Sequence, residues 1–340
     1  MSKKPVSLKD LAKELNVSVS TVSRALKNHP DISASLCKKI QDLAQLKNYS
    51  PNPLAMGLLR RQTRTIGVIV PDIVTHFYSS IIYGIEEVVS EHGYYVVITS
   101  SNESLEKEKR CIKNLLNLRV EGIIVCLSQE TNTFSHFDVL HDNEIPLIFF
   151  DRVCRTDEFS SVIVDNIEAA RQITKHFFDT GSRRIAHIAG PPHLNITQDR
   201  IKGYKQGLAE CGLPFTPDLL VYSKLDHSSG TIATQKLLSM KQIPDAIFGV
   251  NDTIAFAAMQ EVKRNGYKIP EDIAIVGFAD ELHASYVEPP LSSMIHPTLA
   301  MGNQAAKLLM EQTKNSNSFP MQQVILSTEL IIRKSSSKLF

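Results

Sequence analysis

The 340-residue sequence lacks any long apolar run, and it has little cysteine. No stretch approaches the roughly 18 apolar residues of a membrane-spanning helix, so we expect no membrane segment. The five cysteines are scattered without a CxxC pair, which excludes the common zinc motifs and favours reduced thiols in a cytoplasm. The first fifteen residues carry lysines with no apolar segment behind them, unlike a secretory signal peptide. We therefore expect a cytoplasmic protein.

Catalytic and cofactor motifs are also missing. The sequence contains no phosphate-binding GxxxxGK(S/T), no GxGxxG, no HExxH and no GxSxG. The eleven histidines show no ligand spacing. The stretch SLCK at 35–38 imitates a serine–lysine nucleophile, but no partner base accompanies it. These absences argue against an enzyme, and we expect no cofactor and no metal site.

The small net charge of +1 conceals an uneven distribution of charge. Residues 1–64 hold twelve basic and four acidic side chains, whereas the rest holds 25 basic and 32 acidic ones. A basic amino-terminal part joined to an acidic remainder is typical of a polyanion-binding module attached to a separate globular domain. Chance variation in surface charge is the alternative.

Three serines are placed to cap short helices near the amino terminus: Ser7, Ser18 and Ser33. Apolar residues follow Ser7 and Ser33 at helical spacing, which predicts amphipathic helices. The middle segment, NVSVSTVSRALKN, is polar and has few apolar anchors. Two short helices joined by a tight turn and supported by a third describe a helix-turn-helix.

The second helix of such a motif enters the DNA major groove. Arg24 can contact guanine O6 and N7 together, and the exposed Val19 can contact a thymine methyl group. Ser20 can reach a base edge. The remaining hydroxyls suit contacts to phosphates: Ser18, Thr21 and Ser23. A solvated helix face is the alternative.

The stretches VSLKDLAKELNVSVSTVSRAL and YSPNPLAMGLLRRQTRTIGVIVPD closely resemble the amino-terminal region of LacI/GalR-family transcriptional regulators. The resemblance extends over essentially the whole chain. It implies that Ser7 and Ser33 also belong to the DNA-binding set. It further implies a short hinge helix in which Asn52 caps the start and Leu58, with Ala55 beside it, wedges open the minor groove. A plain linker is the alternative for this segment.

From Thr65 onward, short apolar segments alternate with amphipathic ones, which predicts buried parallel strands and covering helices. The pattern occurs twice, so we expect two doubly wound α/β lobes. The resemblance implies a periplasmic-binding-protein-like body. The expected divisions are a helix-turn-helix domain at 1–50, a hinge at 51–64 and a body at 65–340, with an N-lobe at about 65–162 plus 293–322 and a C-lobe at about 163–292 plus 323–340.

Ligands of doubly wound folds bind at the carboxyl ends of the strands. Residues that follow the expected strands, or that match effector-contacting positions of the family, form the candidate effector site: Asp72, Thr75, Phe77, Tyr78, Ser128, Asp151, Arg152, Arg200, Leu225, Asn251, Ala279, Asp280 and His296. The family's usual GFDD is GFAD here, so Ala279 replaces an acidic hydrogen-bond acceptor. Together with Arg152 and Arg200, this loss hints at an anionic effector such as a sugar acid or sugar phosphate.

The sequence thus predicts a homodimeric transcriptional regulator, most simply a repressor of carbohydrate-utilisation genes. It binds a pseudo-palindromic DNA operator and responds to a sugar, sugar acid or sugar phosphate in the cleft between the lobes. Three alternatives remain. They are a regulator controlled by a protein corepressor, a stand-alone sugar-binding protein and an enzyme on a doubly wound fold.

Overall fold

The computed structural model describes residues 6–49, 63–314 and 320–337. The chain divides into two compact units, Met1–Thr63, which we call the head, and Arg64–Phe340, which we call the body. The expected hinge at 51–64 falls mainly outside the described residues.

The head contains the three expected helices, α1 (Leu8–Glu14), α2 (Val19–Ala25) and α3 (Ala34–Leu46). They meet around one small apolar core in which Leu11, Val22, Ala25 and Ile40 are at most 1% exposed. Asn16 adopts a left-handed backbone (φ 53°) that permits the tight turn between α1 and α2. Thus Val22 and Ala25 are the buried residues of α2, and its polar side chains are exposed or only partly buried.

Serine side chains cap two of these helices. The Asp10 N–H donates to Ser7 Oγ (3.3 Å), and the Ser7 N–H donates to the Asp10 carboxylate (2.8 Å), which completes a capping box. Ser18 likewise accepts a hydrogen bond from the backbone of α2. Ser33 occupies the corresponding position before α3, but its hydroxyl makes no such bond and lies 3.4 Å from that of Ser35. The predicted side-chain cap at Ser33 is therefore wrong.

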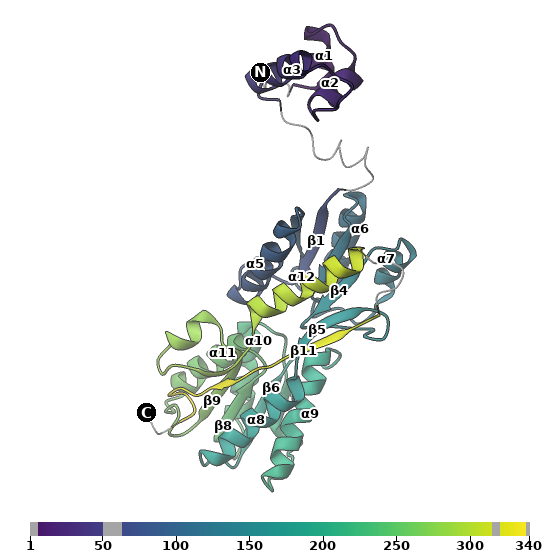
Figure 1. Ribbon diagram of the computed structural model, residues 1–340. Coiled ribbons are helices and arrows are strands. Elements are labelled where there is room, and N and C mark those ends of the chain that lie inside the picture. The colour runs from purple at the N-terminus through teal and green to yellow at the C-terminus, as the bar shows by residue number, and fades with distance from the viewer. Residues whose placement is uncertain (1–5, 50–62, 315–319, 338–340) are drawn as a thin grey trace. The chain divides into compact units, whose positions relative to one another are not determined.

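The body forms two lobes, each built on a six-stranded sheet (Figure 1). The first sheet is parallel throughout, in the order β11–β5–β4–β3–β1–β2. Its strands are β1 (Thr65–Val70), β2 (Tyr95–Ser100), β3 (Gly122–Val125), β4 (Leu147–Phe150), β5 (Ser160–Val164) and β11 (Gln323–Leu326). The helices of this lobe are α5 (His76–Glu91), α6 (Leu105–Asn117), α7 (Asp138–Asp142) and α12 (Thr298–Lys314), with a 3₁₀ turn, η1, at Ser135–Phe137.

The second sheet has the order β12–β10–β9–β8–β6–β7, and only β12 runs antiparallel to its neighbour. Its strands are β6 (Ile185–Ala189), β7 (Leu220–Tyr222), β8 (Ala246–Gly249), β9 (Ala274–Ala279), β10 (Ser292–Ile295) and β12 (Leu330–Ile331). The helices of this lobe are α8 (Asn166–Asp179), α9 (Asn195–Glu210), α10 (His227–Leu238) and α11 (Asp252–Arg264), with 3₁₀ turns η2 (Pro217–Leu219) and η3 (Leu282–Ser285).

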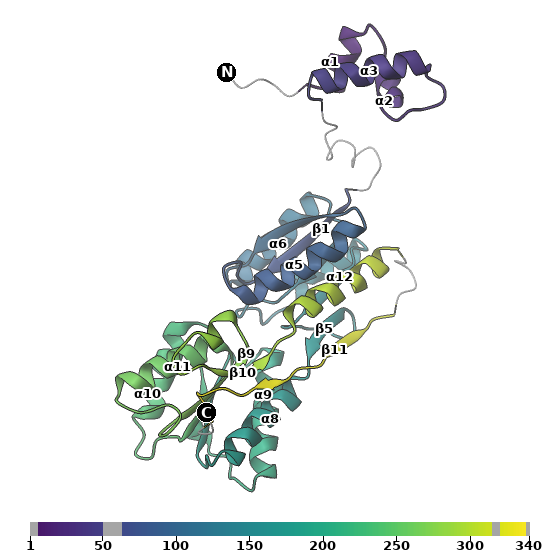
Figure 2. The same ribbon diagram turned by 60° about the vertical axis from the view of Figure 1, so that its left-hand side comes forward.

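The buried strands alternate between two apolar layers, as the sequence pattern predicted. In β1, Ile66 and Val68 pack in the cluster that contains α5 and α12, whereas Ile69 packs in the cluster that contains α6. Helices α5 and α12 lie side by side in both views (Figures 1 and 2), although more than 200 residues separate their starts. The two doubly wound lobes expected from the sequence are confirmed.

The chain crosses between the lobes three times, after β5, after β10 and after β11. These points differ by a few residues from the expected boundaries. The reason is that β5, β10 and β11 each complete their hydrogen bonds in one sheet before the chain leaves it. As a result, β11 is the edge strand of the first lobe, although it was expected in the second.

Gly203 allows α8 and α9 to pack closely, because a Cβ at this position would overlap the carbonyl oxygen of Ile167. We expect Gly203→Ala to lower the free energy of unfolding by about 1–3 kcal/mol through overpacking, despite the better helix propensity of alanine. Denaturant unfolding of the full chain measures the change. The control is Gln206→Ala on the exposed side of α9, which should stay within about 0.5 kcal/mol of the original protein. Equal stability of both variants would contradict the close contact.

Candidate functional site

The amino-terminal end of α2 presents a cluster of hydroxyl groups. Ser18 Oγ lies 2.7 Å from Ser20 Oγ and 2.8 Å from Thr21 Oγ1. Ser18, Val19 and Ser20 are exposed, whereas Thr21 and Ser23 are partly buried. Val19 lies outside the apolar core of the head and is 40% exposed. This end of α2 therefore offers hydroxyls and one apolar contact to a partner.

Arg24, in the last turn of α2, is also directed toward solvent. Its side chain is 55% exposed, and its Nη1 lies 3.9 Å from Asp31 Oδ2. So distant and exposed an ion pair contributes little free energy, so Arg24 can exchange Asp31 for another partner. The structure thus brings Arg24 and the exposed hydroxyls onto one short helix, as predicted. The expected hinge residues lie outside the described residues: Asn52, Ala55 and Leu58.

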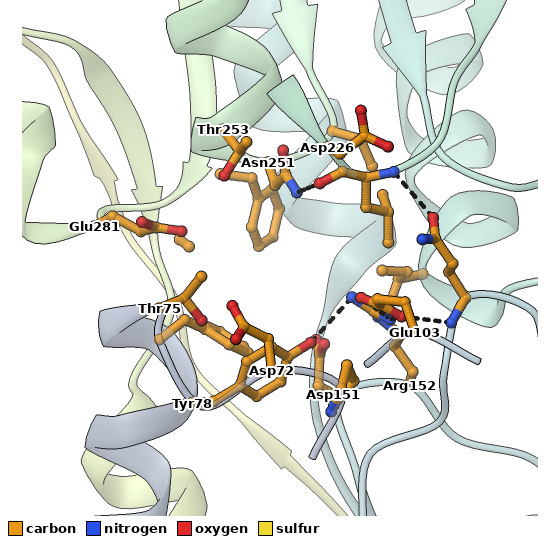
Figure 3. A pocket seen from close by; sticks show the side chains of 18 of the residues that line it. Asp72, Thr75, Tyr78, Glu103, Asp151, Arg152, Asp226, Asn251, Thr253 and Glu281 are labelled. Atoms are coloured by element: carbon orange, nitrogen blue, oxygen red, sulfur yellow. Dashed lines mark hydrogen bonds and ion pairs between the residues drawn. The ribbon is translucent and has the colours of Figure 1, made fainter. Parts of the chain in front are cut away.

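A cavity of about 490 Å³ lies in the body at the strand ends, between the two lobes (Figure 3). Most of the candidate effector residues line it: Asp72, Thr75, Phe77, Tyr78, Asp151, Arg152, Arg200, Leu225, Asn251, Ala279 and His296. A volume of this size accommodates a small organic ligand. The prediction that these residues come together rested on the strand-end rule and on the resemblance to the family.

Arg152 is held by an acidic and a phenolic side chain. Its Nη1 donates to the Glu103 carboxylate (2.8 and 3.0 Å), and its Nη2 donates to the Tyr78 hydroxyl (3.0 Å). Burial alone would lower the pKa of Arg152, but the negative charge of Glu103 raises it above its ordinary value. Arg152 therefore stays charged and paired within the cavity wall.

Arg200 comes from α9 and is 3% exposed. Its Nε donates to Asn166 Oδ1 (2.9 Å), its Nη1 donates to the carbonyl oxygen of Val250 (2.5 Å), and its guanidinium lies 3.5 Å from the centre of the Phe278 ring. Burial lowers the pKa of Arg200 to about 10, which still leaves it charged at neutral pH. Two of its nitrogens and one face are thus already occupied.

Asp151 lies where β4 ends, in a left-handed backbone conformation (φ 56°). His296, at the crossing from β10 to α12, places its Nε2 3.2 Å from Asp151 Oδ1. Burial acts to raise the pKa of Asp151, but the hydrogen bond and charge of His296, together with Arg200 and Arg152, hold that pKa below its ordinary value. The carboxylate is therefore ionised and already bound to a histidine from the lobe crossing.

Hydrogen bonds join the two lobes at one end of the cavity. The carbonyl oxygen of Gln129, from the first lobe, lies 2.8 Å from His193 Nε2, and Gln129 Oε1 accepts from the Leu225 N–H at 3.2 Å. Asn195 at the start of α9 accepts from the Val153 N–H (3.0 Å) and donates to the carbonyl of Asp151 (3.2 Å). The lobes are thus in direct polar contact around the cavity.

The sequence and the structure were compared with known proteins. Residues 7–52 match the family model of bacterial regulatory proteins of the lacI family. Residues 63–333 match that of periplasmic binding proteins and the sugar binding domain of the LacI family. The chain belongs to the LacI family. It is therefore a DNA-binding transcriptional regulator and not an enzyme, as the sequence predicted.

Two curated LacI-family relatives are similar along most of their length. The repressor CytR of Escherichia coli K12 is 32% identical over 98% of this chain and 97% of its own. Catabolite control protein A of Priestia megaterium is 32% identical over 89% of this chain and 91% of its own. The sequence similarity therefore includes both the head and the body.

Solved structures agree with this assignment. A Lac repressor dimer bound to operator and the anti-inducer ONPF is 25% identical, with a TM-score of 0.84 over 98% of this chain and all of that chain. A complex of the regulator CelR with cellobiose is 28% identical, with a TM-score of 0.74 over 97% of this chain and 99% of that chain. The LacI-family architecture of helical head and two-lobed body is thus confirmed.

Two expected members of the effector site do not line the cavity. Ser128 is fully buried behind β3, where its N–H donates to Glu108 (2.7 Å) and its hydroxyl lies 2.8 Å from that of Thr131. Asp280 turns away and receives two hydrogen bonds from Arg333, at 2.6 and 3.2 Å. The cause at Asp280 is a backbone reversal at the end of β9, where two successive residues have positive φ.

The cavity is also lined by residues that the sequence analysis missed: Pro71, Asn102, Glu103, Gln129, Ile196, Asp226, His227, Val250, Thr253, Phe278 and Glu281. Gln129 and Glu281 each lie one position beyond a residue that the sequence analysis chose. Glu103 follows the end of β2, so the strand-end rule applied there as well. Asn251 lines the cavity as predicted, but its Oδ1 accepts from the Ile254 N–H and so caps α11.

Within 6–49, 63–314 and 320–337, no helix is long and apolar enough to cross a membrane. Over the same residues, no group of three or more His, Cys, Asp or Glu side chains is arranged to hold a metal ion.

Proposed function

We propose that this LacI-family regulator represses carbohydrate-utilisation genes. It binds a pseudo-palindromic operator as a homodimer and releases it when a sugar-type effector occupies the cavity between the lobes. The cavity itself carries this proposal, since it lies at the strand ends of two lobes within a chain that also bears a DNA-binding head. The Lac repressor dimer on its operator and CelR with cellobiose support it by analogy. The expected cytoplasmic location accords with a DNA-binding regulator.

The structure also suggests how the effector acts. The chain enters the first lobe at Arg64, the last residue of the expected hinge at 51–64, and that lobe provides Asp72, Asp151 and Arg152 to the cavity. A ligand that binds both lobes favours one relative arrangement of them over another. In our proposal, this change in lobe arrangement is transmitted to the hinge through β1, and the affinity of the head for the operator then falls.

The first experiment measures operator binding by fluorescence anisotropy with and without sugars. Operator fragments come from promoters of neighbouring genes, and each sugar is also tested by thermal shift. We expect a sugar that raises the melting temperature also to release the operator, since a ligand at 100 times its Kd adds about 2.7 kcal/mol to the stability of the native state. Specific DNA binding that no small molecule alters would instead favour a protein corepressor.

Arg24→Ala tests the assignment of α2 as the recognition helix. We expect the variant to lose about 1–3 kcal/mol of binding free energy at one operator position and to discriminate less between bases there. Anisotropy with single-base operator variants measures this loss. The matched control is Lys27→Ala, an exposed basic residue just beyond α2. A uniform loss on all DNA sequences from Arg24→Ala would show that Arg24 contacts a phosphate and no base.

A further inference from the structure

The loop after β3, residues 128–131, contacts the second lobe through Gln129, and we call it the contact loop. The carbonyl oxygen of Gln129 lies 2.8 Å from His193 Nε2, and its Oε1 accepts from the Leu225 N–H at 3.2 Å. His193 follows β6 and Leu225 follows β7 in the second sheet. A displacement of one lobe against the other at this point therefore acts on Gln129.

A buried carboxylate fixes the contact loop to α6. Glu108 of α6 is 0% exposed and accepts from the Ser128 N–H (2.7 Å) and the Thr131 hydroxyl (2.8 Å), and its Oε1 lies 2.9 Å from His136 Nε2. Separating a buried carboxylate from its donors is costly, because the charge then loses its hydrogen bonds without gaining water. Since Ser128 and Thr131 lie on either side of Gln129, Glu108 holds the loop at both ends.

Two further carboxylates join the contact loop to the start of α6. The Gln129 N–H donates to Glu103, just before the helix, at 2.6 Å. In the opposite direction, the N–H of Leu105, the first residue of α6, donates to Glu130 at 3.2 Å and so gains a partner that a helix start cannot supply. The contact loop and the first turns of α6 therefore form one connected unit.

Helix α6 packs tightly on β1, and both views show it beside that strand (Figures 1 and 2). Ile112 and Leu115 of α6 are buried in the same apolar cluster as Ile69 of β1. A Cβ at Gly67 of β1 would lie 2.6 Å from Leu115 Cδ1, so this glycine permits the close approach. The 13 residues of α6 extend about 20 Å, which carries the connection away from the cavity toward the start of β1.

Glu121, just beyond the far end of α6, holds the first residues of the body. Its N–H donates to the Thr65 carbonyl (2.8 Å), and its carboxylate accepts from the Arg64 N–H (2.6 Å) and the Tyr94 hydroxyl (3.0 Å). Arg64 has a left-handed backbone (φ 48°), which is unfavourable for a residue with a Cβ, and its carbonyl accepts from the Tyr95 N–H (2.9 Å). Glu121 thus helps to fix the direction in which the backbone leaves β1 toward the expected hinge.

We propose that α6 couples the arrangement of the two lobes to the expected hinge. Gln129 is the contact at one end, Glu121 holds Arg64 at the other, and Glu108 is the positioning residue that fixes the contact loop to the helix. The inference rests on the proposed function, because it names the residues through which an effector-dependent lobe arrangement reaches the hinge. A displacement at Gln129 shifts α6, and Glu121 then changes its hold on Arg64 at the start of β1.

Hydrogen exchange of the full-length protein, followed by mass spectrometry, tests this coupling without DNA or effector. Gln129→Ala removes the acceptor of the Leu225 N–H. We expect exchange to become faster by about 3-fold or more at Leu225 and also at the distant amides of Arg64 and Tyr95. Faster exchange at Leu225 with no change at Arg64 and Tyr95 would overturn the inference. Unchanged exchange at Leu225 would overturn it too, because Gln129 would then not hold the second lobe.

The matched control is Gln198→Ala. Gln198 is exposed at the start of α9, and its Nε2 donates to the carbonyl of Pro192 at 3.1 Å, so it makes a similar contact wholly within the second lobe. This variant should change exchange neither at Leu225 nor at Arg64. An equal effect of the two variants at Arg64 would show a general loosening of the body and would contradict coupling through Gln129.

A double-mutant cycle on operator affinity then tests whether the two ends act together. Residues that lie far apart and share no partner normally have independent effects, so their fold-changes multiply. We expect the affinity of the double variant Gln129→Ala with Glu121→Gln to differ from that product by about 3-fold or more. The same cycle with Gln198→Ala in place of Gln129→Ala should give the simple product. A simple product in both cycles would overturn the inference and leave the proposed function intact.

If no DNA fragment is bound specifically by the original protein, the proposed function fails, and hydrogen exchange alone decides the inference.

Thr131→Val tests the role of Glu108. The change removes one of the donors to that carboxylate and keeps the side-chain volume nearly constant, so the protein should still fold. In this background, Gln129→Ala should keep its effect on exchange at Leu225 but lose about half or more of its effect at Arg64. An undiminished effect at Arg64 would show that Glu108 does not fix the contact loop to α6, and it would overturn the route proposed here.

Discussion

Replacing Arg200 with alanine should both destabilise the body and abolish its response to effector. The change leaves Asn166 Oδ1 and the carbonyl of Val250 without their buried donor, and it removes the cation from the face of Phe278. Unsatisfied buried acceptors and an emptied side-chain volume together cost about 3–5 kcal/mol of unfolding free energy. Denaturant unfolding measures this cost, and titration with the effector measures the lost response.

The control for this prediction is Arg171→Ala. Arg171 also lies on a helix of the second lobe and pairs with Glu168 and Glu210, but at the surface. Surface ion pairs contribute about 1 kcal/mol or less, so this variant should remain close to the original in stability. An Arg200→Ala protein as stable as Arg171→Ala would show that the buried guanidinium contacts contribute little.

The stability of the body should fall as the pH rises from about 4 to 7, because of Asp252. This residue is fully buried at the start of α11, accepts from Ser293 Oγ (2.6 Å) and the Glu281 N–H (2.7 Å), and burial raises its pKa to about 7. The folded protein therefore keeps a proton that the unfolded chain releases near its ordinary pKa of about 3.9. The stabilisation, about 4 kcal/mol at most, is complete below that pKa and is lost by about pH 7.

Asp252→Asn isolates this effect. Asparagine can still accept from the Glu281 N–H and can donate to Ser293, but it does not titrate, so the variant should lack this part of the pH dependence. Unfolding free energies at intervals between pH 4 and 8 give the comparison, with the exposed Asp142→Asn as control. If the unfolding free energy of the original protein and of Asp252→Asn depends on pH with the same slope, Asp252 does not retain a proton in the folded state.

The sequence correctly predicted the elements in which apolar residues recur at a regular spacing, because that spacing shows directly which side chains are buried. The spacing of Val22 and Ala25 identified the buried side of α2, and the exposed Val19 followed from the same pattern. Likewise, the position of Asp151 and Arg152 after a buried strand placed both in the cavity wall. These predictions need only local spacing.

Predictions failed where the backbone conformation or a distant partner decides the outcome. At the end of β9, positive φ values turn Asp280 away from the cavity and leave Glu281 lining it. The ion pair of Arg152 with Glu103 joins residues 49 positions apart, so no local pattern reveals that the arginine is already neutralised. The expectation of an anionic effector relied on those arginines, and it stays a prediction.

Strand β11 has a consequence for the synthesis of the protein. It completes the sheet of the first lobe, yet in the chain it comes after strands β6 to β10 of the second lobe. The first lobe therefore cannot finish folding until residue 326 has left the ribosome. The three helices of the head need only residues 6–49. A growing chain therefore carries a finished head on an unfinished body, and the ability to contact DNA arises during translation before the ability to be controlled.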